Sequence, residues 1–408
     1  MSPLVVQKYG GSSVADADRI RHVAKRISAR AEEGSSVVAV VSAMGNSTNE
    51  LIALAQRVSR VPHQREMDVL LATGEARSSA LLSMALDDLG HPAVSLNGAQ
   101  AGIQTDAVYG RARIAGIDTA RIERELEHGR VVIVAGFQGV GEDFELRTLG
   151  RGASDTTAIA LAAALDADAC EIYTDVAGIY SADPRVCPTA RPLRDIGHDE
   201  MLELATTGAR VMHARAVEIA ALYNVEVLVT SSFDDSAPGT LIRKETQMEQ
   251  ADKVRGVAHQ NHIAKVTVRG VPDRPGIAAD LFEPLAAAGV SVDTIVQNAS
   301  VEDLTDLTFT VDRAEVAQAV SVVEGILSKI DAGEVVSDPG LGSVSIVGTG
   351  MATTPGYAAR MFRALYEQVI NIELISTSEI RITAIVAADQ VEGAVNALHE
   401  AFTLDRED

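Results

Sequence analysis

Two hydrophobic patterns alternate over residues 1–245. Short runs rich in β-branched residues end at glycine or polar positions, and stretches with helical spacing separate them. The strand-like runs are LVVQKYGG, SVVAVVSAMG, VVIVAGFQGV, EIYTDVAGIY and VEVLVTSS. The helical stretches are 16–33, 49–60, 66–89, 118–129, 154–166 and 198–223. Because the strand-like runs lack polar alternation, they predict an α/β fold with a mainly parallel sheet between helices.

A different organisation follows a charged stretch, RKETQMEQADK, which lacks periodicity and is typical of a linker. Beyond it the chain repeats itself: Pro275-Gly276 recurs as Pro355-Gly356, and Val290 recurs as Ile370 at the same offset. Each copy has the strand and helix pattern of a small βαββαβ module. We therefore predict a first domain over 1–245, a linker and start of the second region over 246–262, and modules over 263–340 and 341–408.

Composition narrows the class of protein. The formal charge of −22 disfavours contact with nucleic-acid phosphates. The two cysteines match neither a metal site nor a disulfide framework, and we expect no bound metal of that kind. No apolar run reaches membrane-spanning length, and the N-terminus lacks the layout of a signal peptide. We expect a cytoplasmic protein with no membrane or nucleic-acid partner.

Polar signatures follow the predicted strands, at the sheet edge where ligands bind in such folds. In KYGGSS, Gly10 and Gly11 leave backbone N–H groups free for an anion before a helix that starts near Ala15. Lys8 supplies a mobile positive charge suited to phosphate. The alternative is a tight strand–helix turn with a surface lysine.

The next two segments suit a small amino acid. In SAMGNSTNEL, Thr48 or Asn49 is placed to cap a helix, and Ser47 and Thr48 can donate to a carboxylate; a plain N-cap is the alternative. In LLATGEARSSALL, Glu75 lies within an apolar helix, where a carboxylate needs a cationic partner. That partner is either a substrate ammonium group or an arginine such as Arg77 or Arg151.

The segment TLGRGASDTTA combines the residue types that a zwitterion needs. Arg151 can hold a carboxylate with two hydrogen bonds, and Gly150 and Gly152 let backbone amides approach closely. We expect Ser154 to cap the following helix and Asp155 to hold an ammonium group. A capped helix start is the alternative, but it leaves the adjacent arginine and aspartate unexplained.

A nucleotide is the ligand that YTDVAGIYSADPR suits best. Thr174 and Asp175 end a strand, Tyr180 offers a flat face, Asp183 a ribose acceptor and Arg185 a phosphate partner. A surface Asp-Pro turn accounts for 183–184 but not for the cluster. No role is assigned to His213, and neither a metal spacing nor a Ser-His-Asp arrangement stands out.

These motifs, in this order, resemble the aspartate kinases of the amino-acid kinase family, most closely the lysine- and threonine-regulated actinobacterial kind. The resemblance covers VVQKYGGSSV, VVSAMGNSTNELI, LLATGE, AGFQGV, TLGRGASDTTA, EIYTDVAGIYSADPR and EMLELATTGARVMHARAVE. The repeat resembles two ACT modules, down to IVQNAS and NIELISTSEIRI. It implies that ATP, with Mg²⁺, phosphorylates the side-chain carboxylate of L-aspartate, the first step towards lysine, threonine and methionine.

The resemblance also implies residue roles. Lys8 and Asp155 would be catalytic. The implied substrate-binding residues are Ser42, Ser47, Thr48, Glu75, Arg151, Gly152 and Ser154. The implied nucleotide-binding residues are Lys8, Tyr9, Gly10, Gly11, Thr174, Asp175, Tyr180, Asp183, Pro184, Arg185 and Arg210. The implied effector-binding residues are Asp273, Pro275, Gly276, Ile277, Ala278, Asp293, Gln297, Asn298, Asn371, Ile372, Thr377 and Ser378.

Threonine or lysine would be the effectors, and ACT modules that pair edge to edge imply a homo-oligomer or a complex with a shorter regulatory subunit. The chain departs from the family pattern at Ala153, where GRGGSD is usual, and at Ala177, where TDVDG is common. A methyl group at 153 would crowd a ligand or bar a positive φ. Two alternatives are therefore a diverged paralogue that phosphorylates another acidic amino acid or serves a specialised pathway, and a non-catalytic amino-acid sensor.

Overall fold

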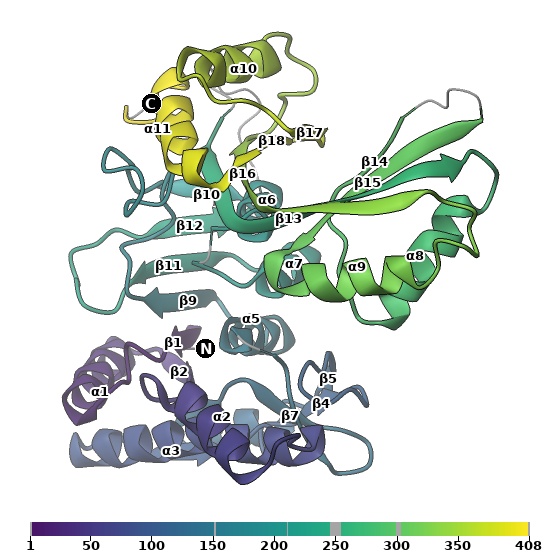
Figure 1. The fold of residues 1–408 in the computed structure, drawn as a ribbon. Coiled ribbons are helices and arrows are strands. Elements are labelled where there is room, and N and C mark those ends of the chain that lie inside the picture. The colour runs from purple at the N-terminus through teal and green to yellow at the C-terminus, as the bar shows by residue number, and fades with distance from the viewer. Residues whose placement is uncertain (1, 151, 210, 245–253, 299–302, 407–408) are drawn as a thin grey trace. The chain divides into compact units, whose positions relative to one another are not determined.

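The computed structural model describes residues 2–150, 152–209, 211–244, 254–298 and 303–406 (Figure 1). The chain forms two compact units. The first comprises Met1–Tyr180, Pro192–Thr206 and Arg210–Glu249, and the second comprises Ser181–Arg191, Thr207–Ala209 and Gln250–Asp408. Two short stretches of the predicted first domain therefore group with the C-terminal region.

An eight-stranded sheet forms the centre of the first unit. Its spatial order is β10 (Asp195–Gly197), β12 (Thr240–Arg243), β11 (Val227–Ser231), β9 (Ala169–Thr174), β1 (Leu4–Tyr9), β2 (Ser36–Val41), β6 (Val131–Ala135) and β3 (Ala93–Leu96). Neighbours run parallel except β11 and β12. The prediction of a mainly parallel sheet is confirmed, and the β-branched runs supply its buried strands.

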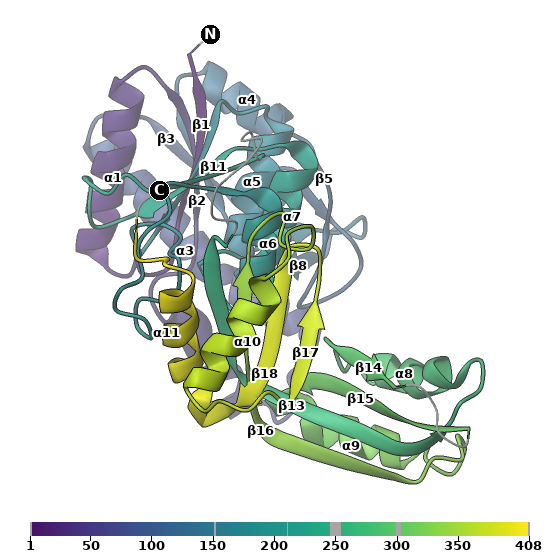
Figure 2. The same ribbon diagram turned by 90° about the horizontal axis from the view of Figure 1, so that it is seen from above.

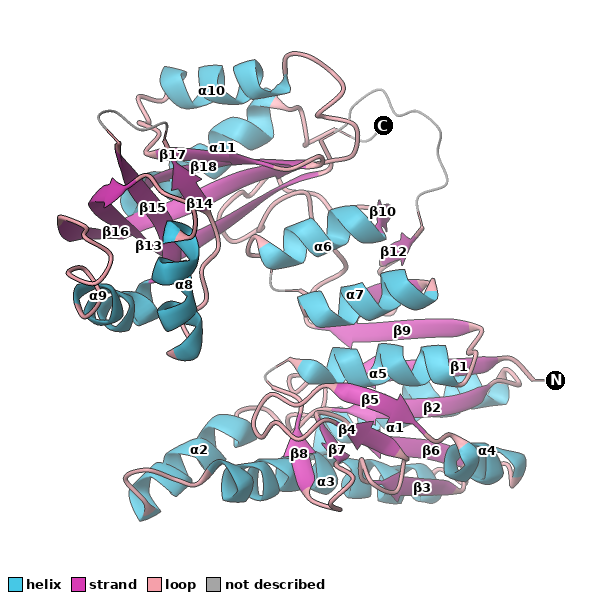
Figure 3. Cartoon of the chain, turned by 90° about the vertical axis from the view of Figure 1, so that its right-hand side faces the viewer, coloured by secondary structure: helices cyan, strands magenta, loops and turns pink. Residues whose placement is uncertain are grey.

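Helices cover both faces of this sheet (Figure 3). The core on one face joins side chains of α1 (Ala17–Glu32) and α3 (Gln64–Asp88) to β1, β2, β6 and β9. On the other face, α5 (Ala153–Ala164) contacts β1, β2 and β9 and packs on α7 (Ala214–Tyr223). The remaining helices of the unit are α2 (Ser47–Val58), α4 (Ala120–Glu127) and α6 (His198–Thr206). This layering places the starts of α1, α2 and α5 directly after or beside strand ends.

Three predicted helix features are wrong. The stretch 198–223 is not one helix, because the chain leaves helical geometry after Thr206, and Gly208 has a φ of 121°. The N-cap of α2 is Asn46, ahead of Thr48 and Asn49. The N-cap of α5 is Gly152 in the left-handed region, so Ser154 lies inside the first turn and caps nothing. In the last two cases the N-cap lies two or three residues earlier than the polar residue suggests.

A second, four-stranded sheet in the first unit was not predicted. Its order is β5 (Ile114–Ile117), β4 (Ile103–Thr105), β7 (Gln138–Val140) and β8 (Leu146–Thr148). The run VVIVAGFQGV contributes to both sheets, because the chain turns at Gly136 and at Phe137, whose φ is 69°. The strands of this small sheet are too short to give a periodic signal of their own.

The second unit contains a six-stranded antiparallel sheet (Figure 2). Its order is β14 (Ile295–Gln297), β15 (Leu304–Asp312), β13 (Gly256–Pro272), β16 (Glu334–Val347), β18 (Arg381–Ala387) and β17 (Leu374–Thr377). Helices α8 (Ile277–Ala287) and α9 (Val316–Glu324) belong to one half, and α10 (Tyr357–Glu367) and α11 (Val391–Ala401) to the other. The two long strands β13 and β16 serve both halves, and each half has its own core.

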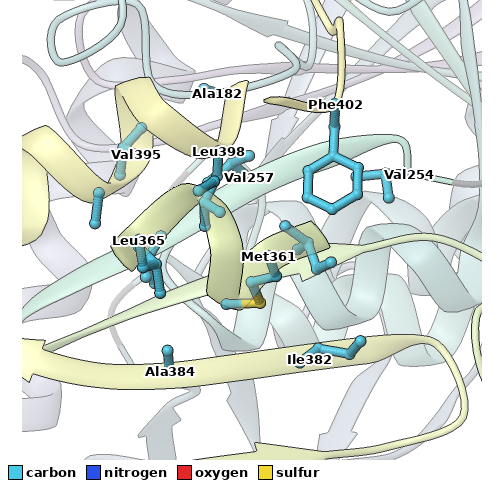
Figure 4. Close-up of a cluster of buried hydrophobic side chains, with 14 of the residues drawn as sticks. Ala182, Val254, Val257, Met361, Leu365, Ile382, Ala384, Val395, Leu398 and Phe402 are labelled. Carbon is cyan, nitrogen blue, oxygen red and sulfur yellow. The ribbon is translucent and has the colours of Figure 1, made fainter. Parts of the chain in front are cut away.

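The core of the second half also includes the stretch Ser181–Arg191. Ala182 and Cys187 are buried there with Val257, Met361 and Leu398 (Figure 4). His399 of α11 contacts the same stretch: its Nε2 lies 2.9 Å from Ser181 Oγ and its Nδ1 lies 3.3 Å from Thr189 Oγ1. Among the described residues, no helix is long and apolar enough to cross a membrane.

Candidate active site

The end of β1 and the start of α5 are joined by an ion pair. Lys8 Nζ lies 2.6 Å from Asp155 Oδ1, with side chains that are 12% and 8% exposed. The two predicted catalytic residues, 147 positions apart in the sequence, are therefore brought together. In water the attraction would be weak, but it strengthens where solvent is largely excluded. The pair places one directed ammonium group beside the glycine turn of residues 10 and 11.

This glycine turn packs tightly against the next loop. Gly45 N–H donates to the Gly11 carbonyl at 2.9 Å, and a Cβ atom on Gly11 would lie 2.9 Å from the Ala43 carbonyl oxygen. Only glycine fits that contact without a shift of the backbone. Tyr9, a predicted nucleotide ligand, is fully buried, and its ring stacks on Tyr173 with centroids 4.8 Å apart. Its side chain therefore belongs to the core.

Glu75 has the buried environment that the sequence suggested, and of its two candidate arginine partners Arg77 bonds elsewhere while Arg151 lies outside the described residues. The residue is 4% exposed; its Oε1 accepts a hydrogen bond from Ala43 N–H at 3.1 Å, and its buried Oε2 has no hydrogen-bond partner among the described residues. Burial raises the pKa of Glu75 to about 7, against the lowering effect of the backbone hydrogen bond. Among the described residues no cation pairs with it, because Arg77 donates instead to Ser47 Oγ. A ligand ammonium group would satisfy the free oxygen.

The loop after β2 presents its polar groups around the same point. Ser42 N–H donates to the Tyr9 carbonyl at 3.1 Å, and Ser78 Oγ of α3 donates to the Ser42 carbonyl at 2.7 Å. Ser47 is buried and bonds to the Met44 carbonyl and to Arg77, whereas Thr48 is half-buried. Ser42 is half-buried as well, and the hydroxyl groups of Ser42 and Thr48 stay predicted ligands of the substrate.

The turn before α5 uses glycine where a positive φ is required. Gly150 and Gly152 have φ values of 90° and 77°, and a Cβ atom on Gly152 would lie 2.9 Å from the His213 ring. Ala153 is helical and 1% exposed, and it packs with Phe137 and Leu149. The departure at 153 is therefore a core methyl group, and the expectation that it would bar a positive φ is wrong. Ser154 is buried, and Arg151 lies outside the described residues.

His213 was left without a role, and the structure places it at this turn. Its ring lies against Gly152, and its buried Nδ1 has no hydrogen-bond partner in the part of the chain that the structure describes. Burial lowers the pKa of His213, the nearby Arg215 lowers it further, and Asp155 opposes both. A neutral imidazole with an unused nitrogen therefore borders the site. The only signal in the sequence is its position just before α7, which is also typical of a packed or capping histidine.

The predicted nucleotide residues divide between the two units. Thr174 ends β9 beside the end of β1, and its Oγ1 donates to Asp175 Oδ1 at 3.1 Å. Tyr180 forms an isolated bridge with Pro192. Asp183, Pro184 and Arg185 belong to the second unit, where the Arg185 guanidinium lies 2.7 Å from Asp183 and lowers the pKa of that carboxyl. Arg210 lies outside the described residues.

The predicted effector residues lie in corresponding places of the two halves of the second unit. Gly276 and Gly356 are the N-caps of α8 and α10, with φ values of 92° and 112°. Gln297 and Asn298 are exposed at the edge strand β14, and Thr377 ends the opposite edge strand β17. The other members are Asp273, Pro275, Ile277, Ala278, Asp293, Asn371, Ile372 and Ser378, and whether any of them binds an effector stays a prediction.

The part of the chain that the structure describes contains no cluster of side chains that could bind a metal ion without a nucleotide. Among the described residues, no group of three or more histidine, cysteine, aspartate or glutamate side chains could hold a metal ion. Mg²⁺ needs fewer protein ligands when phosphate oxygens and water complete its shell. The buried carboxylate of this site is that of Asp155, which is paired with Lys8.

A parallel α/β domain with a largely buried Lys–Asp pair at a glycine turn, followed by a duplicated antiparallel sheet, fits the class of kinases that act on small molecules. Sequence comparison agrees. Residues 3–231 match the amino acid kinase family, and residues 266–327 and 344–402 match ACT domains. The chain belongs to the amino acid kinase family, in its group of aspartokinases.

The relatives extend over the whole chain. An aspartokinase of Mycolicibacterium smegmatis is 50% identical over 411 residues, covering 99% of this chain and 97% of the relative. Aspartokinase 2 of Bacillus subtilis is 48% identical over 403 residues, covering 99% and 98%. The crystal structure of Escherichia coli aspartokinase III in complex with aspartate and ADP superposes with a TM-score of 0.82 at 26% identity, covering 98% and 99%.

Proposed function

We propose that this chain transfers the γ-phosphoryl group of ATP to the side-chain carboxylate of L-aspartate, forming 4-phospho-L-aspartate and ADP. One observation carries the proposal. The backbone of Ala43 contacts both halves of the site, since its N–H donates to Glu75 and its carbonyl packs against Gly11. An ammonium-binding carboxylate is thereby fixed next to the glycine turn that suits phosphate.

The proposed chemistry needs alignment more than a covalent catalyst. The substrate carboxylate is already a nucleophile, so no strong base is required. Lys8 would neutralise charge on the transferring phosphoryl group, with Gly10 and Gly11 offering backbone N–H groups. Glu75 would hold the substrate ammonium group, Arg151 its α-carboxylate, and Thr48 would donate a hydrogen bond. The ion pair with Asp155 supports this role for Lys8, because it fixes the direction of the ammonium group.

Mg²⁺ would accompany the nucleotide and supply charge neutralisation for its phosphates. Asp155 is the residue that would approach it. The nucleotide itself would contact Thr174, Asp175 and Tyr180. On the resemblance, Asp183, Pro184, Arg185 and Arg210 would complete the nucleotide site.

We also propose that the second unit regulates the kinase by binding threonine or lysine. The two edge strands support this, because among the described residues β14 and β17 have no partner strand on one side, and they carry Ile295 and Ile375, which are 52% and 45% exposed. Edge-to-edge pairing with another ACT-bearing chain would cover them. That chain would be a second copy or a shorter regulatory subunit. A crystal structure of E. coli aspartokinase III with lysine and aspartate is among the similar folds.

The alternatives are less well supported. A pure amino-acid sensor has no use for a buried Lys8–Asp155 pair or for a Glu75 with a free buried oxygen. A changed substrate was suggested by Ala153, but that methyl group lies in the core. A role in a specialised pathway stays a prediction.

An ATP-coupled assay with aspartate, glutamate and close analogues tests the proposal. Hydroxylamine can trap the acyl phosphate as a hydroxamate, which identifies the acceptor group. We expect turnover with aspartate, strong loss in Lys8→Ala and Arg151→Ala, and inhibition by threonine, lysine or both. Unchanged turnover in the two variants would refute the residue roles, and turnover with glutamate alone would favour the diverged paralogue.

A further inference from the structure

Two buried residues on α3 lie two turns apart on one face of the helix. Glu75 is the proposed ammonium ligand, and Asp68, seven positions earlier, is 0% exposed. Asp68 pairs with no cation among the described residues. A buried carboxylate without a cation is costly unless other donors satisfy it. The hydrogen-bond partners of Asp68 therefore show which parts of the chain this carboxylate stabilises.

Asp68 accepts hydrogen bonds from two separate segments of the chain, at Gly110 and at Thr148. Gly110 N–H donates to its Oδ2 at 2.9 Å and to its Oδ1 at 3.1 Å, and Thr148 Oγ1 donates to Oδ1 at 2.7 Å. The two segments also bind each other, through Ala112 N–H and the Thr148 carbonyl at 2.9 Å. Charge-assisted hydrogen bonds of this kind are about twice as strong as neutral ones.

Arg215 of α7 holds the same two segments. Its Nη1 donates to the Leu149 carbonyl at 3.0 Å, and its Nη2 donates to the Ala112 carbonyl at 3.1 Å. The guanidinium is half-buried, and burial lowers the pKa of Arg215. Residues 110–112 are therefore held to residues 148–149 by two charged side chains from different helices. The Asp68 carboxylate accepts hydrogen bonds from an N–H group and a hydroxyl group, and the Arg215 guanidinium donates to two carbonyl groups.

Residues 148–149 lead directly into the Gly150-Arg151-Gly152 turn. Gly150 and Gly152 both have positive φ values. Glycines lose the most conformational freedom on ordering, so the positions of these two depend on the residues that flank them. We propose that Asp68 and Arg215 are positioning residues that fix residues 148–149, just before Gly150, and thereby set the affinity for the α-carboxylate of the amino-acid substrate.

This inference rests on the proposed function, because it acts through the role given to Arg151. Neither residue would touch the substrate. Because Asp68 and Glu75 lie on one helix, α3 would keep the ammonium ligand Glu75 at a fixed distance from residues 148–149, which Asp68 holds. The separation of Asp68 and Glu75 along the helix axis is about 10 Å at 1.5 Å per residue. We call the hydrogen bonds of Asp68 and Arg215 to residues 110–112 and 148–149 the clamp. Loss of these bonds is therefore expected to weaken binding of the amino-acid substrate and not of ATP.

The test compares Michaelis constants for the two substrates in the full-length protein. Thr148→Val removes one hydroxyl with little change of shape, and Arg215→Met removes both donors of the guanidinium. We expect the KM for aspartate to rise about five- to tenfold, the size expected for a lost hydrogen bond, with the KM for ATP unchanged within about twofold. Asp68→Ala is expected to raise it further, and Asp68→Asn, which keeps an acceptor for Gly110, to recover part of the loss.

Matched controls are available on the same helices. Thr73→Val on α3 and Glu218→Gln on α7 alter exposed side chains and are expected to leave both KM values unchanged. Hydrogen exchange gives a readout independent of activity: amides of residues 110–112 and 148–150 are expected to exchange faster in Thr148→Val and Arg215→Met. This measurement also applies if Asp68→Ala fails to fold.

The outcomes separate this inference from the proposed function. If Arg151→Ala raises the KM for aspartate while Thr148→Val and Arg215→Met leave it unchanged, the clamp is refuted and the function stands. A parallel rise in both KM values would mean a general structural role and would also overturn the inference. If the wild-type chain does not phosphorylate aspartate, the proposed function itself fails.

Discussion

Lys8 Nζ and Asp155 Oδ1 lie 2.6 Å apart, which joins the end of the first strand to the start of α5. Each side chain belongs to a motif that is ambiguous on its own: a lysine before two glycines, and an aspartate in the first turn of an apolar helix. Their contact makes the two motifs parts of one site. Because both groups are largely buried, each also depends on the other for its charged state to be tolerated.

Breaking this pair is expected to cost stability as well as activity. Lys8→Met leaves a nearly buried carboxylate without its cation, a loss of about 3 kcal/mol in the free energy of unfolding. The double variant Lys8→Met/Asp155→Asn removes both charges and is expected to regain much of that stability without regaining turnover. Denaturant unfolding and the coupled assay measure the two effects. A double variant as unstable as Lys8→Met would contradict the coupling.

Glu75 makes the affinity for aspartate depend on pH. The pKa of about 7 in the free protein means that Glu75 is protonated in much of the population below pH 7 and ionised above it. Only the ionised form attracts an ammonium group, so the KM for aspartate is expected to fall as pH rises from 6 to 8. Initial rates at several pH values measure this.

In Glu75→Gln the KM for aspartate is expected to be higher, and its dependence on pH through 7 to disappear. Ser79→Ala, at another buried polar position of α3, serves as the control and should keep the wild-type profile. A profile that persists in Glu75→Gln would assign the titration to another group.

The same residue is expected to oppose folding at alkaline pH. Because the pKa of Glu75 is about 7 in the folded chain and its ordinary value is 4.5, the stabilising effect of proton binding is complete below pH 4.5 and is lost as pH rises through 7. Glu75→Gln avoids this loss. At pH 8 the variant is expected to be more stable than the wild type by up to about 3 kcal/mol, since one pKa unit corresponds to about 1.4 kcal/mol. Equal stability at pH 8 and at pH 5 would count against a buried, unpaired Glu75.

Ala153 gives a prediction opposite to the one its sequence position suggests. Its methyl group is buried with Ala112 and Leu149 at the first turn of α5. Ala153→Gly, which restores the usual family residue, is expected to lower the free energy of unfolding by about 1 kcal/mol through lost burial and lower helix propensity. Both KM values should stay within about twofold of wild type. A large fall in the KM for aspartate would show that the methyl group reaches the ligand.

Much of the site could be predicted because its residues follow strand ends. The parallel strands fix where Lys8 and Thr174 lie, and the apolar surroundings of Glu75 indicate its burial. The contact of His213 with Gly152 could not be predicted, because it depends on how α7 packs on α5. The small sheet around β7 was missed since its strands have no periodic signal. Likewise, the grouping of Ser181–Arg191 with the second unit follows from tertiary packing alone.

That last feature leads to a prediction for the second unit. His399 is 1% exposed, and its two ring nitrogens contact Ser181 and Thr189. Burial lowers the pKa of His399, Arg191 lowers it further, and Asp405 opposes them. Since the pKa of His399 in the folded chain is below its ordinary value of 6.5, unfolded chains bind a proton more readily. The free energy of unfolding is therefore expected to decrease as pH falls through 6.5.

We therefore expect the second unit to loosen between pH 7 and pH 5. Hydrogen exchange in residues 181–191, corrected for intrinsic rates, is expected to accelerate at pH 5 in the wild type. His399→Gln keeps a donor and an acceptor but does not titrate, so its protection should change little with pH. His262→Gln, at an exposed position of the same unit, is the control and should follow the wild type. If His399→Gln lost protection at pH 5 as the wild type does, the pH response would belong to other groups.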